Sequence, residues 1–254
     1  MAHKDEYYNR AKQEGYRSRA AYKLQQLDEE ATLLQRGRTV VDLGAAPGGW
    51  LQVAKERVRG GTVLGVDRNR IDDLDGVETL RGDITDPDTQ NAIKDRVGSV
   101  DVVLSDMAPN MTGEYSVDHA RSVHLARMAL EVARSVLTGG GDFAVKVFDG
   151  PDVAALRADL ENEFDHVRAI HPEASRDASS EVYLVGKRFL TAPVRAGDEV
   201  AVEITDVGDE GDGIAKVDGF ALFIPDVEVG ESLTVRVEEV KPRFGFAHRL
   251  ETDQ

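Results

Sequence analysis

Residues 40–50 read Val-Val-Asp-Leu-Gly-Ala-Ala-Pro-Gly-Gly-Trp, an apolar run followed by a glycine-rich turn and the start of a helical pattern. Gly44 permits a tight turn, and Gly48 and Gly49 let a ligand approach the backbone at the carboxyl edge of a sheet. The spacing departs from G-x-G-x-x-G, so no diphosphate-binding loop is predicted and a nicotinamide-dependent dehydrogenase is disfavoured. A tight turn without a ligand has the same composition, so other residues must indicate what is bound.

Short apolar runs continue along the chain on both sides of this turn. Several are continuous Val and Leu, which is typical of strands buried on both faces of a parallel sheet. Strands are expected at 39–44, 62–67, 77–81, 100–105, 143–148, 167–170 and 182–186, and amphipathic helices at 50–59, 89–97, 118–137 and 153–164. This alternation predicts an α/β fold, a doubly wound Rossmann-like sheet with helices on both faces.

The two ends of the chain have different patterns. Residues 1–36 are basic and then helical in pattern, which predicts a helix from an N-cap at Ser18 to near Gly37, packed on a domain of residues 37–190. After Ala192 and Pro193 no helical pattern appears. Strands are expected at 199–205, 213–217, 221–224, 233–240 and 245–250, so residues 193–251 predict a small closed β-barrel.

The composition points to a charged protein without disulfides or thiolate metal sites, because its 254 residues include no Cys. The longest apolar runs fall short of the roughly 18 residues of a membrane span, and the polar N-terminus predicts no signal peptide, so we expect a cytoplasmic protein. The 47 acidic and 31 basic residues give a net charge of −16. Excess carboxylates with few lysines predict a halophilic source.

A strongly acidic chain is ordinarily a poor partner for nucleic acid. The first 27 residues are the exception, because they hold six basic and only three acidic side chains. The basic residues of this segment are Lys4, Arg10, Lys12, Arg17, Arg19 and Lys23.

Carboxylates follow three successive predicted strands. Asp67 is placed to accept hydrogen bonds from both ribose hydroxyls of an adenosine group, and Asp83 to meet the adenine amino group. Asp106 can contact a cationic ligand centre or a catalytic lysine. Because phosphates would meet negative charge here, the set favours a nucleoside without phosphates. The alternative for Asp67 is an N-cap of a helix from Asn69, and Asp86 before Pro87 is expected to be an N-cap.

Two charged residues mark otherwise apolar strands. Lys146 interrupts residues 143–148, and because a buried lone ammonium is costly, this lysine is expected to be paired or deprotonated. The alternative is a lysine that reaches solvent along the strand edge. Glu181 begins the strand near 182–186 and can pair with a lysine on a neighbouring strand, or can be a solvated strand end.

Five segments together resemble the FtsJ/RlmE family: Ser-Arg-Ala-Ala-Tyr-Lys-Leu at 18–24, residues 42–50, Ser-Asp-Met-Ala-Pro-Asn at 105–110, the strand lysine, and Ser-Ser-Glu-Val-Tyr at 179–183. The resemblance covers about residues 7–190. It implies an S-adenosylmethionine-dependent ribosomal RNA 2′-O-methyltransferase that needs no metal. The implied catalytic tetrad is Lys23, Asp106, Lys146 and Glu181, and the implied cofactor contacts are Gly48, Trp50, Asp67, Asp83 and Asp106. Residues 193–251 resemble a TRAM domain, an RNA-binding barrel, through 213–220 and 243–247.

The same resemblance implies a substrate, a uridine ribose in the A-loop of 23S ribosomal RNA within the large ribosomal subunit. We expect the enzyme to be a monomer. Methyl transfer to a hydroxyl needs alignment and removal of a proton, and Lys146 can act as the base or as a cation that stabilises the alkoxide. The alternatives are another RNA such as tRNA, a small-molecule or protein substrate, and a non-catalytic ribosome-assembly factor. Candidate RNA contacts in the barrel are Arg195, Lys216, Lys241, Arg243 and Arg249, with Phe244 and Phe246 either stacking on bases or packing the barrel core.

Overall fold

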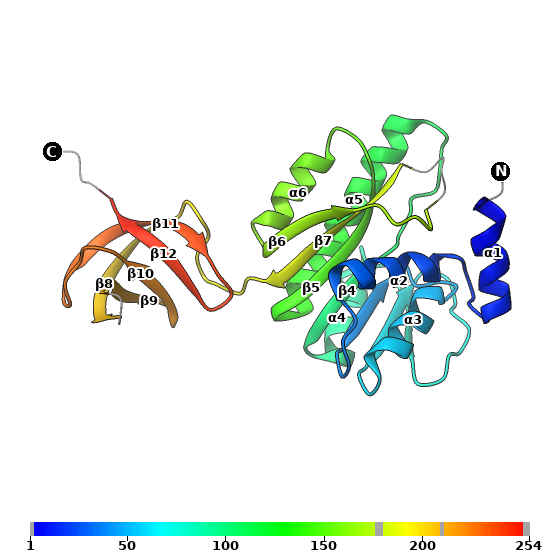
Figure 1. Cartoon of the computed structure of the whole chain (residues 1–254), viewed down its shortest axis with the longest axis horizontal. Helices are drawn as coiled ribbons and strands as arrows, with labels where there is room; N and C mark the ends of the chain where they lie inside the picture. Colours follow the sequence, from blue (N-terminus) through cyan, green and yellow to red (C-terminus); the bar gives the residue numbers. More distant parts are fainter. Residues whose placement is uncertain (1–2, 176–179, 209–210, 251–254) are drawn as a thin grey trace.

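A computed structural model describes residues 3–175, 180–208 and 211–250, so Ser179 of the Ser-Ser-Glu-Val-Tyr motif lies outside it. The larger part is a seven-stranded sheet in the order β3-β2-β1-β4-β5-β7-β6 (Figure 1). Its strands are β1 (Val40–Leu43), β2 (Val63–Asp67), β3 (Glu78–Arg81), β4 (Val100–Ser105), β5 (Leu137–Phe148), β6 (Phe164–Ile170) and β7 (Glu181–Phe189). The helices are α1 (His3–Glu14), α2 (Ala20–Ala31), α3 (Gly49–Val58), α4 (Pro87–Val97), α5 (Tyr115–Val136) and α6 (Val153–Glu161).

The sheet has the Rossmann-like topology that the sequence predicts, with one departure. Strands β1 to β5 pair in parallel, and β1 lies between β2 and β4, so the strand order reverses there. Ligands bind outside the carboxyl ends of the strands at such a reversal. The departure is β7, which runs antiparallel to both β5 and β6. It therefore begins at the carboxyl edge and ends at the amino edge of the parallel strands.

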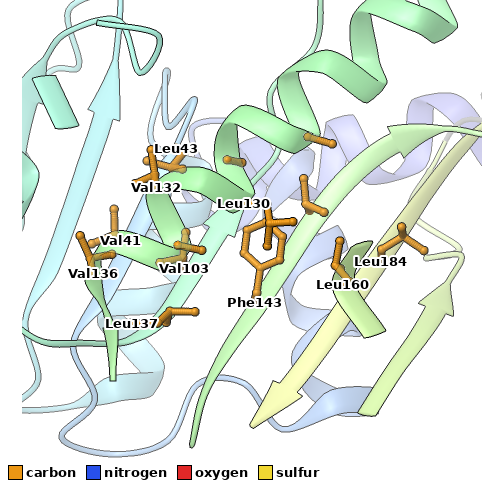
Figure 2. Packing of buried hydrophobic residues seen from close by; sticks show 14 of the residues in the cluster. Val41, Leu43, Val103, Leu130, Val132, Val136, Leu137, Phe143, Leu160 and Leu184 are labelled. Carbon is orange, nitrogen blue, oxygen red and sulfur yellow. The ribbon is translucent and has the colours of Figure 1, made fainter. Parts of the chain in front are cut away.

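Apolar residues cover both faces of the sheet, because successive strand residues point to opposite sides. On one face, Val41, Val103 and Phe143 pack against Leu130 of α5 and Leu160 of α6, as Figure 2 shows. On the other face, α2 and α3 pack over the alternate strand residues. This two-sided burial explains the continuous Val and Leu runs.

The N-terminal region corrects the predicted helix. The helical segment ends at Ala31 instead of near Gly37, because Thr32 adopts a left-handed conformation with φ of 50°. Ser18 is not the N-cap, a position that Arg19 occupies without a side-chain cap. The prediction missed α1 altogether, since its sequence, HKDEYYNRAKQE, is polar around most of the helix.

Two predicted caps have different outcomes. Asp86 is the N-cap of α4, with its side chain accepting a hydrogen bond from the backbone of Asp88, and Pro87 stands at the first helical position. No helix starts at Asn69, so the N-cap alternative for Asp67 is wrong. Asp67 Oδ1 instead accepts a hydrogen bond from the backbone N–H of Asn69 at 2.7 Å, which forms a local turn.

The C-terminal strands form a closed barrel in the order β10-β12-β11-β8-β9. The strands are β8 (Glu199–Val207), β9 (Gly213–Val217), β10 (Phe220–Ile224), β11 (Ser232–Val240) and β12 (Phe244–Arg249). Their alternating residues enclose a separate apolar cluster. In Figure 1 the barrel lies beyond the end of β7, and α1 lies at the opposite end of the molecule. Within the described residues, no helix combines the length and the apolar character needed to cross a membrane.

Folding of this acidic chain is expected to depend on salt. With a net charge of −16, self-repulsion destabilises the compact state, and ions at molar concentration shorten the Debye length to about 3 Å. We expect the unfolding midpoint, followed by the fluorescence of Trp50, to fall steeply when KCl is lowered from molar to millimolar concentration. Sucrose, which does not screen charge, is the control, and an unchanged midpoint in dilute buffer would contradict the expectation.

Candidate active site

Two ion pairs, each with a buried lysine and a partly buried carboxylate, meet at the carboxyl edge of the sheet. Lys146 Nζ on β5 lies 2.9 Å from Asp106 Oδ1, which follows β4, and donates to the backbone carbonyl of Asp106 at 2.7 Å. Lys23 Nζ on α2 lies 2.6 Å from Glu181 Oε2 at the start of β7. Only 7% of Lys146 and 8% of Lys23 are exposed. The structure thus brings all four residues of the predicted tetrad together, as two pairs, and Lys146 is not the solvent-reaching lysine of the alternative.

Tyr183 joins the two pairs, and the sequence analysis did not assign it a role. Its hydroxyl donates to Asp106 Oδ1 at 2.6 Å, and Lys23 Nζ lies 5.9 Å from the centre of its ring. Lys146 and Tyr183 are direct cross-strand partners on β5 and β7. Burial, followed by the negative charge of Asp106, raises the pKa of Tyr183 well above its usual value. The signal was present, because Tyr183 lies two residues after Glu181 and so shares its face of the strand.

The charge state of Asp106 follows from these contacts. Burial alone would raise its pKa, but the ammonium groups of Lys146 and Lys23 and the hydrogen bond from Tyr183 outweigh burial, so the pKa lies below its ordinary value. Asp106 is therefore a carboxylate at neutral pH. It accepts from Lys146 and Tyr183 through the same oxygen, Oδ1, and can accept further hydrogen bonds through Oδ2.

Asp42 on β1 is a second carboxyl group that the sequence analysis left without a role. It is 1% exposed, and among the described residues neither of its side-chain oxygens has a hydrogen-bond partner. Burial, with smaller contributions from the charges of Asp106 and Asp67, raises the pKa of Asp42 well above its usual range. Three carboxyl groups thus influence one another at this edge, which favours a positively charged ligand. An acid inside an apolar strand was the available signal.

Asp67 and Asp83, the two acids predicted to hold a nucleoside, are fixed by local hydrogen bonds. Asp67 Oδ2 accepts from the backbone N–H of Ala46 at 3.0 Å. Asp83 Oδ1 accepts from the backbone N–H and the hydroxyl of Thr85, and these bonds lower the pKa of Asp83. Both side chains are oriented, and each carboxylate keeps lone pairs for hydroxyl or amino groups of a ligand.

The glycine-rich turn differs in detail from the expectation. Gly48 has φ of 109°, and a Cβ built there would lie 2.8 Å from Arg17 Nη1. The Arg17 guanidinium donates to the backbone carbonyls of Pro47, Asp72 and Asp73. The space beside Gly48 is thus filled by a side chain of this chain, which clamps the turn. The close approach of Arg17 is thus one reason for glycine at this position.

Trp50 contributes its side chain to the core. It is 3% exposed, its indole N–H donates to the carbonyl of Ala20 at 2.7 Å, and its ring lies 5.9 Å from that of Tyr183. The Trp50 side chain is therefore engaged in the core, and only the Trp50 backbone is left to contact a ligand.

Several basic residues predicted to contact RNA are already paired within the chain. Arg10 pairs with Glu14, and Arg17 and Lys23 make the contacts described above. In the barrel, Arg195 pairs with Glu163, Lys241 with Glu239 and Arg249 with Glu231. Over the part of the chain that the structure describes, Lys216 and Arg243 carry no ion pair. These two are the cations of the barrel best available to phosphate.

Phe244 and Phe246 lie on the outside of the barrel. With Phe223 they form a cluster whose ring centroids are 5.5–6.1 Å apart, and Phe246 is 38% exposed. The barrel core is built from other residues, including Ala215, Leu222, Ile224 and Ala247. The alternative of a core role for these two rings is therefore wrong.

Comparisons with known proteins match this chain over nearly its whole length. The FtsJ-like methyltransferase family matches residues 16–189, and the TRAM domain family matches residues 193–250. A relative in Natronomonas pharaonis, named ribosomal RNA large subunit methyltransferase E, is 64% identical over 252 residues, covering 99% of this chain and 100% of the relative. A relative of the same name in Halorubrum lacusprofundi is 60% identical, with 99% of this chain and 95% of the relative covered.

A crystal structure from Plasmodium falciparum, described as a ribosomal RNA methyltransferase, is 29% identical with a TM-score of 0.63, covering 68% of this chain and 98% of that one. These matches confirm the resemblance on both parts of the chain and the kinship with haloarchaeal proteins. The chain belongs to the FtsJ-like methyltransferase family and carries a TRAM domain after the methyltransferase domain.

Proposed function

We propose that this chain is an S-adenosylmethionine-dependent methyltransferase that modifies the 2′-hydroxyl of a uridine in the A-loop of 23S ribosomal RNA, within the assembled 50S subunit. The observation that carries the proposal is the meeting of the Lys146–Asp106 and Lys23–Glu181 pairs at the edge where a nucleoside would bind. Stability alone does not explain two ion pairs at this place, because replacing buried ion pairs by well-packed apolar residues is often neutral or stabilising.

The methyl donor fits the charges at this edge. S-adenosylmethionine supplies a methyl group on a positively charged sulfonium, and it carries an ammonium group as well. Asp42 and Asp106 are placed to favour those charges, while Asp67 would bind the ribose hydroxyls and Asp83 the adenine amino group. Gly48 and the backbone of Trp50 complete the set of residues that would hold the donor.

Lys146 would act on the target hydroxyl. An ammonium group has three N–H donors, and two are engaged by the carboxylate and carbonyl oxygens of Asp106, which leaves one for the ribose oxygen. A lysine acting as base must be neutral, so the rate would rise with pH until it deprotonates. A lysine acting only as a stabilising cation would give a rate that falls as it deprotonates. A pH profile of single-turnover methyl transfer separates these two roles.

Recognition of RNA would involve both ends of the chain. The relatives act, by their names, on ribosomal RNA of the large subunit. The TRAM match, the aromatic cluster and the unpaired Lys216 and Arg243 support RNA contact by the barrel. We propose a basic N-terminal segment (1–36), a methyltransferase domain (37–190) and a TRAM domain (193–251), acting as a monomer in the cytoplasm.

A substitution at Asp42 tests the charge of the donor site. The pKa of Asp42 is raised in the folded state, so ionisation of this group destabilises the wild-type fold as the pH rises above the unfolded-state pKa of about 3.9. Asparagine cannot ionise, so Asp42→Asn removes this loss of stability. We expect Asp42→Asn to be more stable than wild type at pH 8, with a smaller gain in Tm from added S-adenosylmethionine. Asp142→Asn, which breaks pairs with Arg38 and Lys187, is the destabilised control. A variant less stable than wild type at pH 8 would contradict this account.

The proposed activity is tested by mass spectrometry of ribosomal RNA from a strain that lacks the gene. We expect one A-loop uridine to lose its 2′-O-methyl group and to regain it on complementation with the wild-type gene. A methyl group missing from tRNA instead would favour the alternative substrate. Complementation of growth, without methylation, by Lys146→Ala would favour a non-catalytic assembly factor. An A-loop that is unmethylated in wild-type cells would overturn the proposal.

A further inference from the structure

The segment that follows Asp106 carries exposed apolar side chains beside the catalytic edge. It runs without regular structure from Met107 to Glu114 and ends where α5 begins at Tyr115. Of the large apolar side chains described between β1 and β7, only Met111 and Tyr115 are exposed, at 63% and 59%. Scattered exposed apolar residues are ordinary, but the contacts of Tyr115 give its ring a fixed place next to the site.

The ring of Tyr115 is held in one orientation by two contacts. It stacks on His119, one turn further along α5, with ring centroids 6.3 Å apart and ring planes inclined by 12°. Its hydroxyl donates a hydrogen bond to the backbone carbonyl of Asp149, in the loop after β5. His119 is 3% exposed and covers one face of the tyrosine ring, so the exposed area lies on the other face and the rim.

His119 is itself fixed by the loop after β5. Its Nδ1 lies 2.9 Å from the carbonyl oxygen of Phe148, and because a carbonyl only accepts, Nδ1 carries the proton in this contact. Its Nε2 accepts a hydrogen bond from the backbone N–H of Asp152 at 3.3 Å. The tyrosine ring therefore rests, directly and through His119, on residues 148–152.

This loop connects Tyr115 to the catalytic pairs. Asp149 lies three residues after Lys146, and three residues span at most about 10 Å between their Cα atoms. Phe148 is the cross-strand partner of Glu181 on β7. The hydroxyl of Tyr115 is therefore at the same end of β5 as Lys146, and its ring is exposed at the edge where the two ion pairs meet.

The acids proposed to hold the donor lie three strands away from this ring. Asp67 ends β2 and Asp83 follows β3, whereas Tyr115 contacts the loop after β5. In the strand order, β2 and β5 are three spacings apart, which is about 14 Å. In methyl transfer the accepting oxygen must approach the methyl group from the side opposite to the sulfur. The accepting nucleoside is therefore expected on the β5 side, where Tyr115 is exposed.

We propose that the base of the target nucleotide stacks on the exposed face of Tyr115, which sets the position of its 2′-hydroxyl at Lys146. This inference rests on the proposed function and names a residue that holds the acceptor. A nucleotide whose ribose enters an active site leaves its own stack, and its base then needs a new stacking partner. Because His119 and Asp149 already fix the tyrosine ring, binding costs little ordering of the protein at this place.

Two substitutions separate the ring of Tyr115 from its hydroxyl. Tyr115→Phe and Tyr115→Leu both remove the hydrogen bond to Asp149, but only Tyr115→Phe keeps a ring. On unmethylated large subunits we expect kcat/KM per folded molecule to stay within about 3-fold of wild type in Tyr115→Phe. In Tyr115→Leu it should fall about 10-fold or more below Tyr115→Phe. The affinity for S-adenosylmethionine, measured by calorimetry, should match wild type in both variants.

Photocrosslinking locates the base without measuring turnover. Large subunits reconstituted with 5-iodouridine at the target position are irradiated in complex with the full-length enzyme, and the crosslinked peptide is identified by mass spectrometry. We expect the crosslink on the peptide that contains Tyr115, and we expect Tyr115→Leu to lose it.

Equal kcat/KM for Tyr115→Phe and Tyr115→Leu, or a crosslink on a distant segment, would overturn the inference. A loss of donor affinity in Tyr115→Leu as large as its loss in kcat/KM would give the ring a structural role and would also overturn it. A wild-type enzyme that methylates no large subunit would overturn the proposed function itself, and this inference with it.

Discussion

Replacement of Lys146 by Ala is expected to lower the single-turnover rate of methyl transfer by about 10³-fold. In the proposed mechanism the ammonium group of Lys146, which is bound to Asp106, contacts the target hydroxyl, and alanine leaves nothing in its place. The rate is measured with tritiated S-adenosylmethionine and unmethylated large subunits. Donor binding, measured separately by calorimetry, should change far less than the rate.

A matched control is available on the neighbouring strand. Lys187 is also a lysine paired with a buried aspartate, since its Nζ lies 2.7 Å from Asp142 Oδ2, but the pair is at the opposite edge of the sheet. Lys187→Met is expected to lower stability and to leave the rate per folded molecule near that of wild type. If Lys146→Ala retained the wild-type rate, or if both variants lost the same activity, Lys146 would have no catalytic role.

The second large effect is expected for Asp106→Asn. The substitution removes the charge that pairs with Lys146, and breaking such a pair is expected to cost about 3–5 kcal/mol of folding free energy. The rate of methyl transfer is expected to fall about 10²-fold. Because the folded-state pKa of Asp106 is depressed, its ionisation stabilises the protein above the unfolded pKa of about 3.9. That contribution is lost as pH falls through the lower folded value. The free energy of unfolding, measured with denaturant between pH 7 and pH 3, should fall with pH in wild type and fall less steeply in the variant.

Tyr183→Phe is a milder change at the same group than Asp106→Asn. It removes the hydroxyl that donates to Asp106 and keeps the ring, the carboxylate and the lysine. A loss of about 10-fold in rate is expected, with a smaller change in stability than in Asp106→Asn.

An Asp106→Asn enzyme with wild-type rate and wild-type stability at acid pH would show that the Lys146–Asp106 pair is not required.

The sequence was informative where a residue type conflicts with its surroundings. A lysine within the apolar run 143–148 and acids after three successive strands were enough to indicate the site, because burial of charge demands a reason. The alternating pattern predicted the doubly wound sheet with helices on both faces, and with it a candidate site at the carboxyl ends of the strands, but it did not give the order of the strands. These inferences depend on local sequence alone.

The features of the candidate site that the sequence did not predict depend on contacts between distant segments. The antiparallel direction of β7 places Tyr183 beside Lys146, and no local pattern sets that direction. The clamp by Arg17 on the glycine-rich turn joins residues about thirty positions apart. A role for Asp42 cannot be predicted from the sequence, because its lack of a hydrogen-bond partner is visible only when the neighbouring strands are in place.

The most direct test of the account is a crystal structure of the protein with sinefungin, an unreactive analogue of S-adenosylmethionine in which an amine replaces the methyl-bearing sulfonium. We expect the ribose hydroxyls on Asp67, the adenine amino group on Asp83, and the amine that replaces the methyl group directed toward Lys146 and Asp106. An analogue bound away from this edge, or a Lys146 side chain turned away from it with Asp106 unpaired, would contradict the account.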